Sequence, residues 1–438
     1  MRPDPTLKGI LPRLKLAATL GGVVLVGLAL PRGAPAATSC PAPGKTWTAS
    51  APASVGLDGA KLQSAFDWAT AHESYSVLVV RHGCLAGASR LDPVTSMVPL
   101  DGWSMTKSVV SMLVGRAVTL GRFDIDKPIG TWVPGADAAH AALTPRQLLT
   151  MSSGLHRNWI RDVFENPIMP DSVADALSLR FDHAPGTWWE YQQTPVTLLG
   201  YAVERAVGKD LQSFAQEQLF GKIGIAAGSW IWDRDRAGHT HGWAHLHMRS
   251  PDWARLGYLM LHGGNWNGTQ LISSSYVQAS ITRNPLDHAN GMLWWLNGGD
   301  TFVLPAVYGQ DAGPGELIPG APHDMYLMAG MQNQRVYVIP SLDLVIVRLG
   351  EPGSNELDTR SSVWTGRAGE LDHELLRRIL ESVTDVHVPD MGPYRGSSLV
   401  LPPTNAGMVG DATELNDVMA GAGVPRWGPA GCTPAGCG

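Results

Sequence analysis

The sequence is poor in charge and contains no block of basic residues. Charged residues make up 16% of the 438 residues, and the formal net charge is −6. Proteins that bind nucleic acid carry a basic patch or stripe for the phosphates, so the composition argues against that class. The chain also lacks an uninterrupted apolar run of the roughly 20 residues that a membrane-spanning helix needs. The expected partner is therefore a small molecule, uncharged or mildly polar.

The N-terminus has the pattern of an export signal. A short apolar run, Leu16 to Leu30, precedes the small residues "APAA" and follows the basic residues Arg2, Lys8, Arg13 and Lys15. We expect residues 1–36 to be a signal peptide and the mature protein to be secreted or periplasmic, without stable membrane insertion. A retained anchor is one alternative. Lipidation of Cys40 is another, although "ATSC" lacks the leucine usual before such a cysteine.

Cysteine is scarce, with four residues in the whole chain. An even number in an exported protein favours two disulfides. Of the three connectivities, the local pair Cys432–Cys437 is favoured, which leaves Cys40 to pair with Cys84. Free buried thiols are the alternative.

Hydrophobic periodicity indicates an α/β body between residues 55 and 384. After a leader, residues 37–54, "LDGAKLQSAFDWATAH" has helical spacing, and "SYSVLVVRHGCLAGASR" is a β-rich run. The segment 325–350 predicts two antiparallel strands joined at Pro340–Ser341, and "GELDHELLRRILESV" predicts a closing helix. Residues 385–438 form a tail rich in proline and glycine.

The middle of this body, about residues 105–270, has mostly helical patterns. Glycines follow three predicted helices, at Gly121, Gly154 and Gly208, as helix C-caps favour. Another begins at "RSPDWARLGYLMLHGG", with Ser250 expected as N-cap. The order predicts an antiparallel sheet domain flanked by helices, with an inserted mainly helical domain.

Ser104 and Lys107, in "DGWSMTKSVV", are three residues apart at a helix start. This spacing places both side chains on one face, where a neutral lysine could take the proton of the serine hydroxyl. The signal is weak by itself, because an S-x-x-K sequence arises easily by chance. The simpler interpretation is that Ser104 caps the helix and Lys107 is solvated.

Four further stretches make the chemical interpretation more specific. They are "SMTKSVVSMLVGRAVTLGRFDIDKPIGTWVPG", "LTPRQLLTMSSGL", "PGTWWEYQQTPVTLLGYAVERAVGKDLQSFAQEQLFGKIGI" and "AGMQNQRVYVIPSLDLVIV". In order and spacing, over roughly residues 55 to 383, the chain resembles the serine β-lactamase-like superfamily, which includes penicillin-binding proteins. The nearest branch resembles the class C β-lactamase-related hydrolases, with esterases and aminohexanoate-dimer hydrolases.

The resemblance implies a role for each matching residue. Ser104 would be the nucleophile and Lys107 its base, and Tyr191 in "EYQQ" would shuttle a proton to the leaving group. In "MAGMQ", Gly330 would let the substrate approach the backbone. The N–H groups of Met331 and Ser104 would form the oxyanion hole.

Two positions depart from the family pattern. Met328 stands where the third motif usually begins with a cation or a histidine, and no lysine follows Lys222 in the chain. Gln193 replaces an asparagine, which keeps the amide but lengthens the side chain. The missing cation argues against β-lactams and carboxylate-terminated peptides as substrates.

A cluster of histidines, "HTHGWAHLHM", suggests a competing hypothesis, a metal-dependent hydrolase using His239, His241, His245 and His247. No acidic residue falls inside this cluster, and no H-E-x-x-H sequence occurs. We therefore assign no metal ligand and interpret the segment as a polar loop at the rim of the site. A catalytically inactive ligand-binding relative is a further alternative.

The sequence thus predicts an exported serine hydrolase of the carboxylesterase or amidase type. It would cleave an ester or an amide through an acyl-enzyme without a cofactor, with esterase activity favoured. A β-lactamase or DD-peptidase is the alternative within the same family. Nothing in the sequence specifies the oligomeric state.

Overall fold

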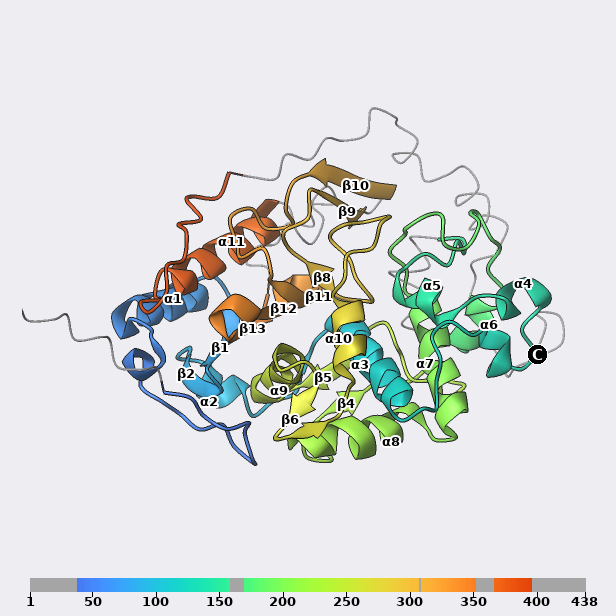
Figure 1. Ribbon diagram of the computed structural model, residues 1–438, viewed down its shortest axis with the longest axis horizontal. Coiled ribbons are helices and arrows are strands. Elements are labelled where there is room, and N and C mark those ends of the chain that lie inside the picture. Colours follow the sequence, from blue (N-terminus) through green and yellow to red (C-terminus); the bar gives the residue numbers. More distant parts are fainter. Residues whose placement is uncertain (1–37, 158–168, 307–308, 352–365, 396–438) are drawn as a thin grey trace, which may run out of the picture. The chain divides into compact units, whose positions relative to one another are not determined.

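The central sheet of the computed structural model has six antiparallel strands. The structure describes residues 38–157, 169–306, 309–351 and 366–395 (Figure 1). The sheet order is β2-β1-β13-β12-β11-β8. The strand bounds are β1 (Ser74–Arg81), β2 (Cys84–Ala88), β8 (Trp295–Leu296), β11 (Tyr326–Gly330), β12 (Gln334–Ile339) and β13 (Leu344–Gly350). The sheet confirms the predicted α/β class.

The segment 325–350 contains one more strand than its pattern predicts. The predicted hairpin is present as β12 and β13, joined by a short 3₁₀ turn at Pro340–Leu342. The residues before it form β11, which turns into β12 through another short 3₁₀ turn, Met331–Asn333. Gln332 and Asn333 in this turn have φ of 60° and 58°. Gly330 directly precedes this turn and Asn333 lies in it, but the β-rich pattern before Pro340 predicts only a single strand.

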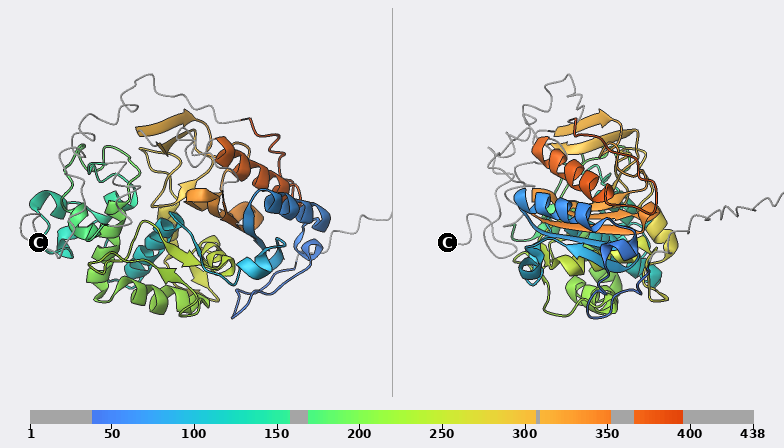
Figure 2. Two further views of the ribbon diagram at one scale, coloured as in Figure 1. Left: turned by 180° about the vertical axis from the view of Figure 1, so that it is seen from behind. Right: turned by 90° about the vertical axis from the view of Figure 1, so that its left-hand side faces the viewer.

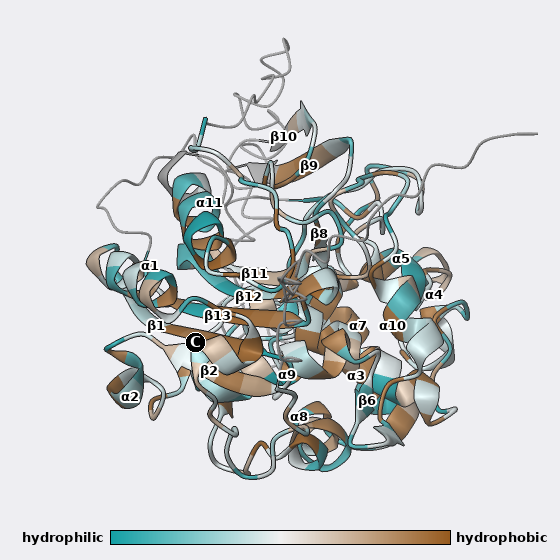
Figure 3. Cartoon of the chain, turned by 60° about the vertical axis from the view of Figure 1, so that its left-hand side comes forward, coloured by the Kyte–Doolittle hydropathy of each residue, from teal (hydrophilic) through white to brown (hydrophobic). Residues whose placement is uncertain are grey.

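Helices cover both faces of the sheet, which explains why β12 and β13 are buried along their whole length. Helices α1 (Gly59–Ala71) and α11 (Gly366–Leu380) pack together on one face (Figure 2). On the other face α9 (Ser250–Leu261) crosses β12 and β13. A β-carbon at Gly257 of α9 would lie 2.8 Å from Val336 and 2.9 Å from Val345, so a glycine allows this close packing. The strands are largely brown in Figure 3, whereas α11 carries both teal and brown residues.

Between residues 105 and 270 the chain is mainly helical. The helices are α3 (Met105–Thr119), α4 (Ala138–Ala141), α5 (Pro145–Leu149), α6 (Ser172–Ala176), α7 (Thr194–Val207), α8 (Leu211–Ala215) and α9. A small sheet of order β3-β5-β4 lies among them, with β3 (Leu100–Asp101), β4 (Ile231–Trp232) and β5 (Leu246–Met248). All described residues belong to one compact unit, and a separate helical domain stays a prediction.

The remaining elements are short. They are α2 (Asp92–Thr95), α10 (Ser274–Ser280), the hairpin of β9 (Thr301–Ala306) and β10 (Gly309–Pro314), and the hairpin of β6 (Asn265–Trp266) and β7 (Thr269–Gln270).

Two predicted helix ends are wrong. The helix expected to run from Thr144 to Gly154 is α5, which begins with a Thr144–Gln147 capping box but ends at Leu149. Gly154 instead lies in a loop with φ 73°, where a β-carbon would be 2.2 Å from the His183 carbonyl oxygen. Ser250 does not cap α9 but is its first residue. Its hydroxyl donates a hydrogen bond to Asp92 instead.

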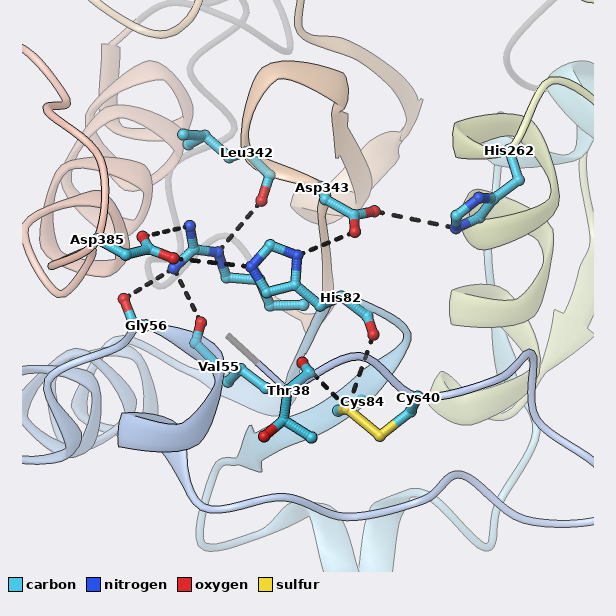
Figure 4. A network of polar contacts seen from close by, with 11 residues as sticks. Thr38, Cys40, Val55, Gly56, His82, Cys84, His262, Leu342, Asp343 and Asp385 are labelled. Carbon is cyan, nitrogen blue, oxygen red and sulfur yellow. Dashed lines mark hydrogen bonds and ion pairs between the residues drawn. A yellow bond between two sulfur atoms is a disulfide. The ribbon is translucent and has the colours of Figure 1, made fainter. Parts of the chain in front are cut away.

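The predicted disulfide Cys40–Cys84 is confirmed, with a Cα–Cα distance of 5.0 Å (Figure 4). Beside it, the backbone N–H of Cys40 donates to the His82 carbonyl at 2.8 Å. Cys432 and Cys437, like the predicted signal peptide and most of the tail, lie outside the described residues. No helix among the described residues is long and apolar enough to cross a membrane.

Candidate active site

The turn before α3 places Ser104 in a constrained position. Asp101 ends β3, and its Oδ1 accepts a hydrogen bond of 2.7 Å from the Trp103 N–H. Trp103 has φ 48°, a conformation that costs on the order of 1 kcal/mol or more outside glycine. The indole N–H of Trp103 donates to Gln332 at 3.3 Å. These bonds hold the backbone immediately before Ser104 from both sides.

Lys107 is brought to Ser104 as its spacing predicts. Its Nζ lies 3.0 Å from the Ser104 Oγ, and the residue is only 3% exposed. The same Nζ lies 2.8 Å from the Trp243 carbonyl and 2.5 Å from the Gln193 Oε1. Both of those oxygens can only accept hydrogen bonds. An uncharged amine could therefore donate hydrogens to them while its lone pair accepts a proton from Ser104.

Tyr191 and Gln193 come to this lysine from the loop before α7. The Lys107 Nζ is 4.7 Å from the centre of the Tyr191 ring, and the same ring lies 5.9 Å from Trp295 between centroids. The buried Gln192 anchors the loop, because its amide donates to the Leu155 carbonyl. The structure thus groups Ser104, Lys107, Tyr191 and Gln193, and their catalytic roles remain predictions.

The end of β11 lies against the same turn. A β-carbon at Gly330 would be 2.2 Å from the Gly102 carbonyl oxygen and 3.1 Å from the Trp103 Cβ. Because Gly330 has no side chain, the backbone at Gly102 can pack against it. The motif predicts a second role for this glycine, the approach of substrate to the backbone. Among the described residues, neither the Ser104 N–H nor the Met331 N–H donates a hydrogen bond. Both are therefore available to an oxyanion.

Met331 and Met328, both predicted near the substrate, differ in exposure. Met331 is 44% exposed, whereas Met328 is fully buried on β11. The buried thioether has no surface to offer a ligand in this conformation, so a contact between Met328 and substrate remains a prediction.

The four histidines of the cluster have different neighbours in the structure. His239 lies 3.6 Å from Asp171. His241 is buried, and this burial lowers the pKa of its imidazole, with the neighbouring His245 acting in the same direction. His245 Nδ1 meets the Asp101 Oδ2 at 2.8 Å.

Asp101, His245 and His247 converge, and their potential metal-binding atoms all lie within 4.8 Å of one another. Sequence reasoning missed Asp101 because it precedes His245 by 144 residues. The segment 239–247 therefore contains no acidic residue in sequence, but the fold brings Asp101 next to two of its histidines. No short-range pattern in the sequence could have indicated that Asp101 contacts His245.

Comparison with known proteins identifies the family of the chain. A family model described as "Beta-lactamase" matches residues 60–350. A protein of Escherichia coli strain K12 named "Putative D-alanyl-D-alanine carboxypeptidase" is 23% identical over 266 residues, which cover 46% of this chain and 61% of that protein. The chain spans between one third and about three fifths of the length of the curated relatives that it matches.

Solved structures support the fold. One titled "Putative 6-aminohexanoate-dimer hydrolase from Bacillus anthracis" is 17% identical, with a TM-score of 0.56 over 70% of this chain and 79% of that one. A family VIII carboxylesterase is 14% identical, with a TM-score of 0.52 over 74% of this chain and 97% of that one. At these identities the similarity shows a common fold.

Proposed function

Because the chain belongs to the β-lactamase family, we propose that it is an exported serine hydrolase that cleaves an ester or an amide through an acyl-enzyme. The observation that carries the proposal is the environment of Lys107. Its Nζ lies 3.0 Å from the Ser104 hydroxyl. The Gln193 and Trp243 oxygens at this nitrogen cannot donate, whereas the Ser104 hydroxyl can give it a proton.

The proposed reaction begins when Ser104 Oγ attacks the substrate carbonyl carbon and its proton passes to Lys107. The carbonyl oxygen gains negative charge, which the N–H groups of Ser104 and Met331 would stabilise. The leaving group then departs with a proton delivered through Tyr191. In the second half, water attacks the acyl carbon while Lys107 and Tyr191 take its proton. The bond from this carbon to Ser104 Oγ then breaks, the proton returns to Ser104, and the carboxylic acid product is released. No metal ion takes part in these steps.

We favour an esterase within this family. The names of two structural neighbours include a carboxylesterase and an aminohexanoate-dimer hydrolase. The name of the E. coli relative keeps a DD-peptidase as the second candidate. The missing cation at Met328 supports the first choice, because enzymes that hold a carboxylate-bearing substrate need a partner for that charge.

The test compares Ser104→Ala with the wild type on short p-nitrophenyl esters, nitrocefin, a D-Ala-D-Ala peptide and an aminohexanoate dimer. We expect Ser104→Ala to lose at least about a thousandfold in kcat. The matched control is Ser275→Ala, an exposed serine on α10, which should keep wild-type rates. Dialysis against EDTA should leave activity intact. Loss of activity in EDTA, restored by zinc, would instead support the metal-dependent alternative.

A further inference from the structure

We propose that Asp101, His245 and His247 form a binding site for a divalent transition-metal ion of the zinc class, beside the turn that carries Ser104. Each residue offers one ligand atom, and these atoms lie within 4.8 Å of one another. Two imidazole nitrogens and a carboxylate oxygen form a donor set that suits Zn²⁺ and similar ions. Three protein ligands leave further coordination positions for water.

The small sheet explains why the three side chains meet. Asp101 of β3 is paired directly with His247 of β5 in the antiparallel register. Residues directly opposite each other project to the same face of a sheet. His245 lies two residues before His247 and has φ 63°, a left-handed conformation that is uncommon for histidine. The register and this backbone conformation therefore bring together ligands that are far apart in sequence.

The contact between His245 and Asp101 indicates which atoms would bind the ion. The His245 Nδ1 lies 2.8 Å from the Asp101 Oδ2, so these two atoms share a proton. Metal ligands must be deprotonated, and an ion bound to both atoms would replace that proton.

The three ligand atoms must move slightly closer together to coordinate one metal ion. Metal–ligand bonds of about 2.0–2.2 Å place tetrahedral ligand atoms about 3.4 Å apart, so separations of up to 4.8 Å must shrink by up to about 1.4 Å. The side chains of Asp101, His245 and His247 are 19%, 13% and 28% exposed. Asp233 Oδ1 lies 4.0 Å from the His247 Nε2 and is a further carboxylate within reach.

The proposed metal site is joined to the Ser104 turn through short contacts. Asp101 Oδ1 holds the Trp103 N–H, one residue before Ser104. The carbonyl of Trp243, which lies two residues before His245, accepts a hydrogen bond from Lys107. A bound ion would therefore raise the stability of the folded turn, and we expect activity to be the same with and without the ion.

The test is isothermal titration of ZnCl₂ into tag-free, metal-stripped protein, with thermal unfolding as the second readout. We expect one Zn²⁺ per chain and a rise in Tm with zinc concentration, as for any ligand that binds the folded state. His247→Ala should weaken binding at least about tenfold. His239→Ala is the matched control, because His239 belongs to the same segment but lies beside Asp171, and it should bind like the wild type.

Several outcomes would overturn the proposal. These are no saturable binding by the wild type, unchanged affinity in His247→Ala, or equal weakening in His239→Ala, which would indicate unspecific binding to surface histidines. His247→Gln replaces the alanine variant if that variant does not fold. Ser104→Ala should bind zinc normally, so the result does not depend on whether Ser104 is the nucleophile.

Discussion

At the scale of single residues, Arg335 next to the candidate site is engaged by the protein itself. Arg335 is fully buried on β12 and forms an ion pair of 2.8 Å with Asp372. It also donates to the Gly330 carbonyl at 2.8 Å. The cation nearest in sequence to the third motif is thus engaged in holding β11. Relatives of the family carry a cation at the position of Met328. The Met328 side chain is uncharged and cannot form an ion pair with a substrate carboxylate.

This arrangement predicts a preference for neutral substrates. A carboxylate next to the scissile bond would lose hydration without gaining an ion pair, at a cost of about 1–3 kcal/mol. Neutral short esters should therefore show kcat/KM values about tenfold or more above those of matched esters with a free carboxylate, at 1.4 kcal/mol per decade. Steady-state kinetics on matched pairs measures this. A preference for the carboxylated member would favour the DD-peptidase alternative.

At the scale of elements, the contact between β11 and the turn before α3 positions the candidate site. Gly330 fits against the Gly102 carbonyl because it has no side chain. The sequence motif predicted a glycine needed for close approach, and the structure adds which backbone approaches. The third strand of the 325–350 segment, which the pattern missed, is the strand that carries this glycine.

Gly330→Ala should therefore reduce both activity and stability. The added carbon would be 2.2 Å from a backbone oxygen, so the end of β11 must move away from the Ser104 turn. Such overpacking costs about 1–3 kcal/mol in unfolding free energy, and a displaced oxyanion donor costs roughly a hundredfold in kcat/KM.

Gly44→Ala is the control for this change, because nothing lies within 4 Å of its added carbon. Kinetics and denaturant unfolding of both variants test the prediction. Wild-type kcat/KM in a folded Gly330→Ala would show that β11 does not position the site.

At the scale of the whole molecule, distant segments join around β1. Arg81 of β1 pairs with Asp385 at 2.7 Å, and His82 meets Asp343 at 3.0 Å (Figure 4). The disulfide attaches the start of the described chain to β2 beside this network. The sequence predicted this disulfide by pairing and exclusion, but it did not predict the ion pairs, because their partners are separated by 304 and 261 residues.

The same limit applies to the candidate site. The Ser104–Lys107 contact follows from helix geometry, since residues three apart share a face. Asp101 and His245 meet only through the register of β3 with β5, which no local pattern encodes. Local spacing and the family resemblance could therefore be predicted, whereas contacts made by tertiary packing could not.

A buried carboxyl group also makes stability depend on pH. Burial raises the pKa of Asp287 from 3.8 to about 6. Because the folded value lies above the unfolded one, this group's stabilising contribution is fully present below about pH 3.8 and is lost as the pH rises through about 6. The loss amounts to about 2–3 kcal/mol at 1.36 kcal/mol per pKa unit.

Asp287→Asn should remove this loss between pH 4 and pH 7, because an amide does not titrate. Denaturant unfolding at the two pH values measures the difference for the variant and the wild type. Asp67→Asn, an exposed change on α1, is the control and should retain the wild-type difference. Equal pH dependence in Asp287→Asn and the wild type would contradict the assignment to Asp287.

The central claim, that Ser104 is the nucleophile, is tested most directly by covalent labelling. Intact protein is incubated with a fluorophosphonate, its mass is measured, and the tryptic peptide of residues 91–107 is fragmented, because it contains both Ser96 and Ser104. We predict one adduct per chain, located on Ser104 and absent from Ser104→Ala. An unlabelled wild type, or an adduct that persists in Ser104→Ala, would contradict the account.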